Sequence, residues 1–186
     1  MNLSYIISAP DFAKYEYVTL ATAKQHLKID FDYEDELIQQ YIFSAITCVE
    51  DYTDKFIYPR NVKVQADSFM DQIPVEHLPF LDGNFTVSYQ DINDVTRTSD
   101  AYELINTFGD KPSFCYVSNE NAPDITSSHK AVVFEYQSGY TPDTLPDPLR
   151  SAILLLISEF YEYRSDRQEI LSTRAQALMR PYKKMY

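Results

Sequence analysis

A cluster of carboxylates early in the chain is the first candidate for chemistry. The members, which lie within seven residues, are Asp30, Asp32, Glu34, Asp35 and Glu36. Three of them, Asp30, Asp32 and Glu34, are at alternate positions, which is similar to the opening of a calcium-binding loop. Such a loop needs glycine at its sixth position and glutamate at its twelfth; counted from Asp30, these positions hold Asp35 and Tyr41. The pattern therefore favours an acidic linker that leads into a helix, and we expect no metal site.

Other catalytic constellations fail in the same way. His26, His77 and His129 lie far apart, and the two cysteines form no CxxC pair, so zinc ligation is not indicated. The chain has three glycines, and they form neither a phosphate-binding fingerprint nor the Gly-x-Ser-x-Gly elbow of a nucleophile. Glu135 lies in a strand-like run, but no lysine follows it as a metal-dependent nuclease would require. We expect no catalytic residue, no metal and no cofactor, and we expect that the protein is not an enzyme.

The charge is unevenly distributed over the 186 residues. The net charge is −12, of which the first 149 residues carry −15 and the last 37 carry +3. An acidic body argues against a domain that grips phosphate backbones. A basic end favours self-association or docking on a partner, although a solvated basic helix would have the same composition.

The start of the chain and its cysteines bear on location. The opening MNLSYIISAP has no basic residue and only a short apolar run, so we expect no signal peptide. The most apolar stretch, 152–157, is too short to span a bilayer. Cys48 and Cys115 do not form a disulfide framework, and free thiols are typical of a reducing cytoplasm.

Two helices are predicted near the N-terminus. The first covers about residues 19–28, with Thr19 as its N-cap. The second covers about 34–53, and its acidic first turn suits the positive end of the helix dipole. The residues of its apolar stripe, which recur at helical spacing, are Leu37, Ile38, Tyr41, Ile42, Ala45, Ile46 and Val49. Together these helices predict an αα-hairpin.

Between about residues 58 and 140 the hydrophobic period changes to two. The alternating positions are Val62, Val64 and Ala66, then Phe85, Val87 and Tyr89, then Val133 and the run Phe134-Glu135-Tyr136. Turn signals occur at Asp82-Gly83-Asn84, Gly109-Asp110-Lys111-Pro112 and Ser138-Gly139. This pattern predicts an inserted antiparallel β region, and the fold class is therefore α+β.

A third helix is predicted over about residues 147–164, with Asp147 as N-cap and Pro148 as the first helical residue. Five consecutive apolar residues, 153–157, cover its whole circumference. Such a helix is buried on all sides, either entirely within its own chain or partly against another subunit. The candidate subunit-interface residues are Leu154, Leu155, Ile157 and Tyr161.

The remaining residues, 165–186, are predicted to form a C-terminal arm, separate from a core of residues 1–164. The apolar positions of the arm suffice only for a weak amphipathic helix, which needs a partner surface. Its candidate partner-binding residues are Arg167, Ile170, Leu171, Arg174, Leu178, Met179 and Arg180.

The order of these elements resembles the head–tail connector (adaptor) proteins of tailed bacteriophages. One set of motifs opens the chain: residues 17–28 resemble "xLaeaKxhLrvd", and residues 35–53 resemble "dDxliexxixaAxxxvE" followed by "yTg". Matching positions are Lys24, Leu27, Asp35, Leu37, Ile38, Ala45, Glu50, Tyr52 and Thr53. Asp54 stands where glycine is usual. The second set lies at residues 136–140, which resemble "YxaGy", and 145–164, which resemble "vPxxikqAilllvahwYenR".

The resemblance implies a structural role. Connectors assemble as a ring of about twelve copies beneath the portal, extend the DNA channel without sequence-specific binding, and offer a platform for the next neck or tail protein. It also implies that the C-terminal arm docks on the portal. The expected location is the virion neck, after synthesis in the host cytoplasm, with no membrane contact. Alternatives are another neck or tail-completion protein, a portal-associated assembly chaperone, or a metal-assisted nuclease.

Overall fold

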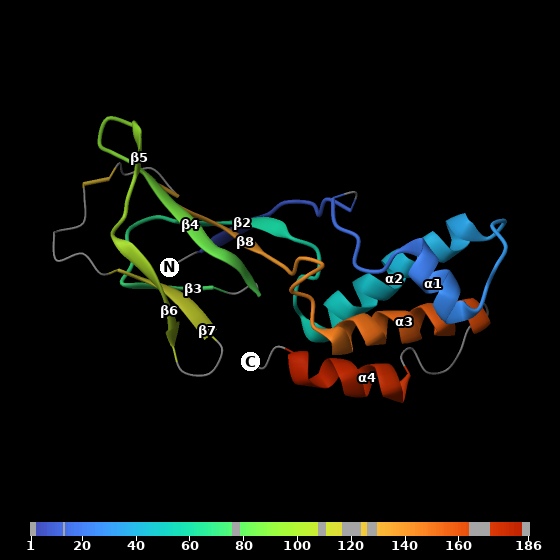
Figure 1. The fold of residues 1–186 in the computed structure, drawn as a ribbon. Coiled ribbons are helices and arrows are strands. Elements are labelled where there is room, and N and C mark those ends of the chain that lie inside the picture. The colour runs from blue at the N-terminus through green and yellow to red at the C-terminus, as the bar shows by residue number, and fades with distance from the viewer. Residues whose placement is uncertain are drawn as a thin grey trace. The chain divides into compact units, whose positions relative to one another are not determined.

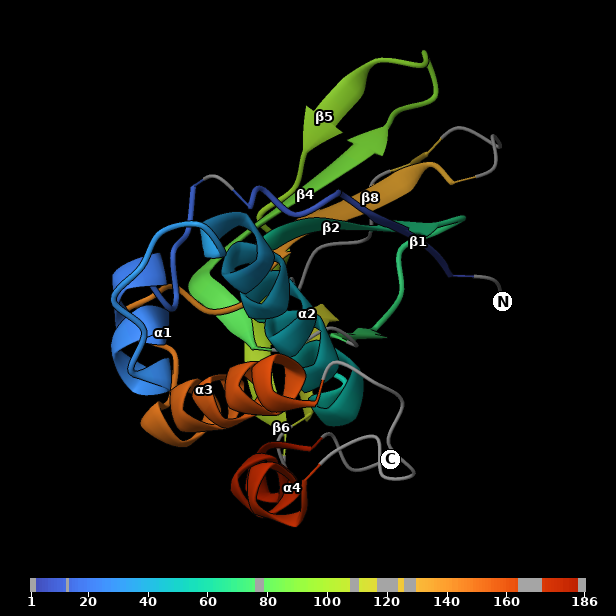
Figure 2. The same ribbon diagram turned by 90° about the vertical axis from the view of Figure 1, so that its right-hand side faces the viewer.

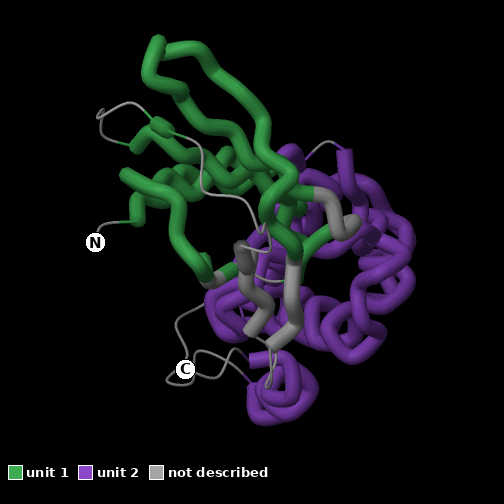
Figure 3. The backbone as a smooth tube through the Cα atoms, turned by 90° about the vertical axis from the view of Figure 1, so that its left-hand side faces the viewer, with its two compact units in different colours: residues 1–10, 59–139 green, residues 11–58, 140–186 purple. Residues whose placement is uncertain are grey.

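The computed structural model describes residues 3–12, 14–75, 79–107, 111–116, 124–125, 130–163 and 172–183. The chain forms two compact units (Figure 3). The β unit comprises residues 1–10 and 59–139, and the helical unit comprises residues 11–58 and 140–186. The chain therefore passes between the two units three times, and the β unit is largely an insertion in the helical one.

The helical unit contains the elements that the hydrophobic spacing predicted, together with a packed fourth helix (Figure 1). Its helices are α1 (Leu20–Leu27), α2 (Asp35–Thr53), α3 (Asp147–Glu162), α4 (Thr173–Met179) and the 3₁₀ turn η1 (Arg180–Tyr182). Thr19 caps α1 as expected, because its hydroxyl accepts the amide of Thr22 at 3.0 Å. At α3 the prediction was one residue late: Pro146 is the N-cap, and Asp147 already lies in the first turn.

One hydrophobic core holds the helical unit together. The buried apolar side chains of α2 are on the predicted stripe, and they meet those of α3 and α4. The largest of them are Ile38, Ile46, Val49, Leu149, Ile153, Leu156, Ile157 and Met179. Burying a side chain of this size contributes roughly 1.5–3 kcal/mol, so this core is the main source of stability of the unit.

Hydrogen bonds join the segments of the helical unit that flank the inserted β unit in the sequence. The Tyr17 hydroxyl lies 2.9 Å from the carbonyl oxygen of Ile57 and 2.6 Å from that of Tyr140. The Tyr140 amide donates to the Ile57 carbonyl at 3.0 Å. Glu50 Oε1 accepts the amides of Ile57 and Tyr58, at 2.7 and 3.0 Å. Burial raises the pKa of Tyr17 well above its usual value, so its hydroxyl stays protonated and able to donate.

The β unit is built from two antiparallel sheets. The five-stranded sheet has the order β1-β2-β8-β4-β5, and the three-stranded sheet has the order β3-β7-β6. The strands are β1 (Ser4–Ile7), β2 (Arg60–Ala66), β3 (Gln72–Pro74), β4 (Phe80–Gln90), β5 (Thr96–Thr98), β6 (Tyr102–Thr107), β7 (Lys111–Tyr116) and β8 (Val132–Ser138).

The predicted alternation sets the register of the large sheet. Val62 and Val64 of β2 lie opposite Tyr136 and Phe134 of β8, and all four side chains are buried. Val87 of β4 lies opposite Phe134 from the other side. Cross-strand pairs of this kind, aromatic against β-branched, stabilise a sheet by roughly 0.2–1 kcal/mol each. The α+β fold class is confirmed.

Two features of the β unit differ from expectation. The turn predicted at Asp82-Gly83-Asn84 is absent: these residues continue β4, and the register with β8 shifts between Phe80 and Phe85. A glycine within a strand commonly marks such an irregularity. The turn predicted at Ser138-Gly139 is present, with φ of 136° at Gly139. A turn was also predicted at residues 109–112. Residues 109 and 110 lie outside the described residues, and Lys111 and Pro112 begin β7.

Candidate subunit and partner interfaces

The candidate interface residues of α3 differ in burial. Ile157 is fully buried in the core of the helical unit, next to Leu156. Leu154, Leu155 and Tyr161 are only partly buried and pack at the edge of that core. The side of α3 that carries Ile157 is therefore covered by the core. The side that carries Leu154 and Leu155 keeps part of its apolar surface exposed. Leu154 and Leu155 are the α3 residues best placed for a neighbouring subunit.

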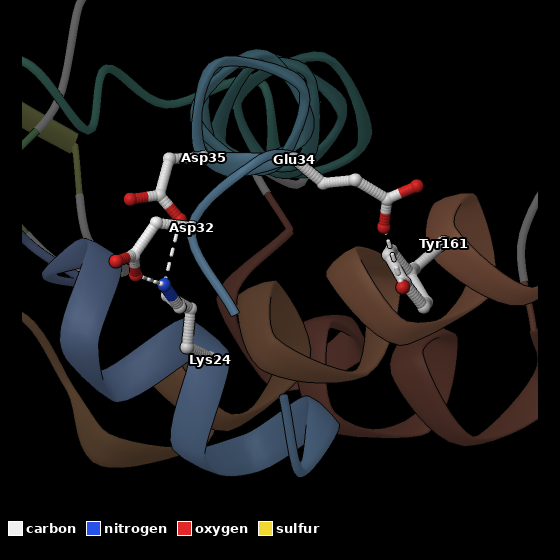
Figure 4. A network of polar contacts seen from close by, with 5 residues as sticks. All are labelled: Lys24, Asp32, Glu34, Asp35 and Tyr161. Carbon is white, nitrogen blue, oxygen red and sulfur yellow. Dashed lines mark hydrogen bonds and ion pairs between the residues drawn. The ribbon is translucent and has the colours of Figure 1, made fainter. Parts of the chain in front are cut away.

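Tyr161 has a specific polar partner within the unit. Its hydroxyl donates to Glu34 Oε2 at 2.6 Å, and this bond ties the end of α3 to the start of α2 (Figure 4). Glu34 is the N-cap residue of α2, yet its side chain does not cap that helix. The acidic start of α2, expected to serve the helix dipole, is therefore also used to hold α3.

The acidic linker is held by a cation of α1. Lys24 Nζ lies 2.6 Å from Asp32 Oδ1 and 2.7 Å from Asp35 Oδ1 (Figure 4). The hydrogen bonds to Asp32 and then to Asp35 raise the pKa of Lys24. Lys24 and Asp35 are both among the residues that carry the family resemblance. Their contact fixes the path of the chain between α1 and α2, which is a structural task.

No metal-binding cluster occurs among the described residues, the acidic linker included. The described histidine, His26, is exposed on α1, and His77 and His129 lie outside the described residues. Burial raises the pKa of the Cys48 thiol, with a smaller contribution from Asp51. This shift favours the neutral thiol over the reactive thiolate. In the described parts of the chain no helix combines the length and hydropathy needed to cross a membrane.

The described part of the predicted C-terminal arm packs against the rest of the helical unit. Helix α4 lies beside α3 (Figure 2). Ala175 and Met179 of α4 are fully buried, and Leu178 is partly buried. The start of the helix is also fixed. The Ser172 hydroxyl accepts the Ala175 amide at 3.2 Å, while the Ser172 amide donates to Glu159 Oε2 of α3 at 3.2 Å.

The candidate partner-binding residues of the arm that the structure describes fall into three groups. Arg174 and Arg180 are exposed, Leu178 is partly covered, and Met179 belongs to the core. The other three, Arg167, Ile170 and Leu171, lie outside the described residues. The exposed arginines are available to a partner as the chain stands. Met179 is available only if α4 leaves α3.

An aromatic pocket in the helical unit was missed by sequence reasoning. It has a volume of about 200 Å³ and is lined by Phe12, Tyr15, Glu16, Tyr17, Val18, Gln39, Ile42, Phe43, Ile46 and Tyr58. Phe43 lies on α2 but outside its predicted apolar stripe, and it is exposed. A large aromatic residue on the polar face of a helix was the one signal that pointed to this surface.

Comparisons with known proteins agree with the family resemblance. Residues 17–103 match the family of phage gp6-like head–tail connector proteins. Similar folds occur in the neck of an empty gene transfer agent (GTA) particle computed with C6 symmetry, at 18% identity and a TM-score of 0.70. They also occur in the virion of the native particle, at 19% and 0.71, and in its neck computed with C12 symmetry, at 19% and 0.70. Each match covers 100% of this chain and 97% of the other. None of the curated protein sequences matches the chain.

Proposed function

We propose that the chain is an adaptor subunit of the virion neck that forms a ring under the portal. The observation that carries the proposal is the match of residues 17–103 to that family. The fold similarity to chains of phage-like necks, which extends over the whole chain, supports it. Those necks have six-fold or twelve-fold symmetry, which supports a homo-oligomeric ring.

The acidic character of the chain suits a channel. DNA has to slide through the neck during ejection, and a lumen that binds phosphates would slow it. A net charge of −12 gives a surface that repels the DNA backbone. The ring extends the channel and contacts passing DNA without reading its sequence.

Contact between subunits in this proposal uses the open side of α3. Leu154, Leu155 and Tyr161 are partly buried in the single chain, so a neighbour can cover the remaining apolar surface without any rearrangement. Ile157, which is already enclosed, contributes by supporting α3 from inside.

Attachment to the portal is assigned to the C-terminal arm, residues 165–186. Its charge is +3, and Arg174 and Arg180 present two of its cations to solvent. We expect these residues to meet acidic portal surface, and attachment therefore to weaken as salt concentration rises. We expect the face of the ring that points away from the portal to bind the next neck or tail-completion protein.

The test of the ring is co-purification with the portal protein from the same genome, followed by electron microscopy and native mass measurement. We expect a closed ring of this chain bound to the portal. The composition of mature particles separates the two structural alternatives. A connector is retained at ring stoichiometry, whereas a chaperone is present only in assembling heads, and that second result would contradict the proposal.

The test of the arm is a charge reversal rather than a deletion alone. Ending the chain after Arg164 removes Ala175 and Met179 from the core, so loss of attachment could follow from loss of stability. The double change Arg174→Glu and Arg180→Glu keeps that core and should abolish attachment to portal-bearing heads. Lys28→Glu, a charge reversal at the exposed residue that follows α1, is the control. Normal attachment by the double variant would overturn the docking proposal.

A further inference from the structure

The hairpin of β4 and β5 carries apolar side chains at its tip. The tip, residues 91–95, joins the two strands at one end of the large sheet (Figure 2). Ile92 is 67% exposed and Val95 is 51% exposed. Tight turns usually carry glycine, proline or small polar residues. Two large aliphatic side chains on an exposed turn therefore indicate a contact outside the single chain.

The tip is held in one conformation by the Asp91 side chain. Its Oδ1 accepts the amides of Asn93 and Val95 at 2.8 and 3.1 Å, and its Oδ2 accepts Arg97 Nε at 2.7 Å. The Asp91 amide donates to the Val95 carbonyl at 3.0 Å. These bonds fix the tip before it meets anything. A preordered element loses less conformational entropy on binding than a flexible loop.

The aromatic pocket of the helical unit has the size and composition to receive such a tip. Phe12 and Phe43 are both exposed at its surface. Phe12 is held by edge-to-face contacts, with its ring centroid 5.6 Å from that of Phe43 and 4.9 Å from that of Tyr58. A dry cavity of about 150 Å³ accommodates benzene. A pocket of about 200 Å³ therefore has room for a branched aliphatic side chain.

The charges around the tip and around the pocket are complementary. Glu16 lines the pocket. Lys14 is exposed beside it, with its ammonium nitrogen 5.1 Å from the ring centroid of Tyr15, another lining residue. The tip offers the opposite pair, an exposed Asp94 and the exposed Arg97. Each site thus has one cation and one anion next to its apolar centre, an arrangement that sets orientation.

We propose that the hairpin tip of one copy inserts Ile92 and Val95 into the aromatic pocket of the next copy, with Asp94 facing Lys14 and Arg97 facing Glu16. This inference rests on the proposed ring and names a contact that builds it. The hairpin tip and the aromatic pocket are different surfaces of the chain, so the contact between copies is head-to-tail. Repeated around an axis, a head-to-tail contact generates a ring when the rotation between copies closes. It acts in addition to the contact assigned to α3.

Cross-linking between single-cysteine proteins tests the contact directly. One protein carries Asn93→Cys at the tip and the other carries Gln39→Cys in the pocket, both with Cys48 and Cys115 replaced by serine. Mixed and oxidised, they should give a disulfide-linked heterodimer. Because each protein has one cysteine, a bond within a chain cannot form this product. Lys63→Cys, an exposed site on β2, replaces Gln39→Cys in the control and should give little product. No heterodimer above this control would overturn the proposal.

Two sets of variants test the energetic role of the tip. Ile92→Ser with Val95→Ser should raise the apparent dissociation constant between copies by at least about tenfold, while Thr96→Ser with Thr98→Ser on the same hairpin should not. Lys14→Glu and Asp94→Lys should each weaken assembly, and their combination should restore it. Unchanged assembly of the Ile92 and Val95 double variant would overturn the proposal.

The outcomes also separate this contact from the proposed function. Rings that form without the cross-link contradict the inference and leave the adaptor role intact. A cross-link between copies that never close into rings contradicts the ring and leaves the contact intact. The absence of both contradicts both.

Discussion

The hydroxyl of Tyr17 lies 2.6 Å from the carbonyl oxygen of Tyr140, a residue 123 positions later in the chain. The same hydroxyl lies 2.9 Å from the carbonyl oxygen of Ile57. It therefore joins the segment before α1 to both points at which the helical unit gives way to the inserted β unit. A single buried group holds three distant segments together.

Replacing Tyr17 with phenylalanine should lower the free energy of unfolding by about 1–3 kcal/mol, because the ring keeps its packing while buried carbonyl groups lose a donor. Chemical denaturation followed by circular dichroism measures the change. Tyr33→Phe is the control, since the Tyr33 side chain is exposed and stacked on Phe31. Equal stability of the two variants would contradict the role given to Tyr17.

Neighbouring leucines of α3 should respond differently to truncation. Leu156→Ala should destabilise the chain by about 2–5 kcal/mol, because Leu156 is fully buried and its loss leaves a cavity. Leu155→Ala should cost less, since Leu155 is only partly buried. Thermal unfolding of the isolated chain compares the two.

Assembly should show the reverse order of sensitivity. Leu155→Glu should give a folded chain that no longer forms rings on the portal, because a charge is then placed on the open side of α3. Sedimentation or native mass measurement detects the loss. A Leu155→Glu protein that still forms portal-bound rings would remove Leu155 from the subunit interface.

The end of α1 offers a stabilising change. Lys28 has φ of 59° and ψ of 43°, the left-handed region, in which a side chain costs about 1–2 kcal/mol relative to glycine. The greater freedom of glycine in the unfolded chain cancels part of this gain. Lys28→Gly should therefore raise the free energy of unfolding by a net several tenths to about 1 kcal/mol. Gln25→Gly, in the interior of the same helix, should lower it by about 1 kcal/mol. Urea titrations of both variants check the sign.

The hairpin tip should lose its order in acid. The hydrogen bond from Arg97, followed by that from the Val95 amide, lowers the pKa of Asp91 below its ordinary value of 3.8. The ionised Asp91 therefore stabilises the folded tip fully when the pH is above the ordinary pKa. This stabilisation is lost as the pH falls through the lower pKa that Asp91 has in the folded chain. Amide resonances of Asn93 and Val95, followed by NMR below pH 4, should report the change. In Arg97→Gln the transition should move to higher pH, and an unmoved transition would contradict this assignment.

Much of the fold could be predicted because its signals are local. The stripe of α2, the alternation of Val62 and Val64, and the cap at Thr19 each depend on neighbours within a few residues. The α+β class is confirmed on that basis, and residues 17–103 match the predicted family. The structure also accounts for Asp54, where the family has glycine: it adopts φ of 53° at the end of α2, the conformation for which glycine is suited.

The interaction surfaces depend on contacts that sequence spacing does not encode. Phe12 and Phe43 line one pocket because their rings pack together across 31 positions of the chain. No local pattern in the sequence signals such a contact. Strand β1 was also missed, since Ser4–Ile7 has no alternation and gains its order only by pairing with β2. The docking of the arm, the subunit contacts and the absence of catalysis stay predictions.

The three crossings of the chain have an evolutionary consequence. Residues 59–139 leave and re-enter at Tyr58 and Tyr140, and the Tyr140 amide is hydrogen-bonded to the Ile57 carbonyl at 3.0 Å. An insertion whose ends lie so close together can be exchanged between lineages as a cassette. The exchange has one condition, since Ser4–Ile7 forms the edge of the same sheet against β2. A recombinant that replaces residues 59–139 must therefore also replace the first ten residues, and mosaic relatives should inherit these two stretches together.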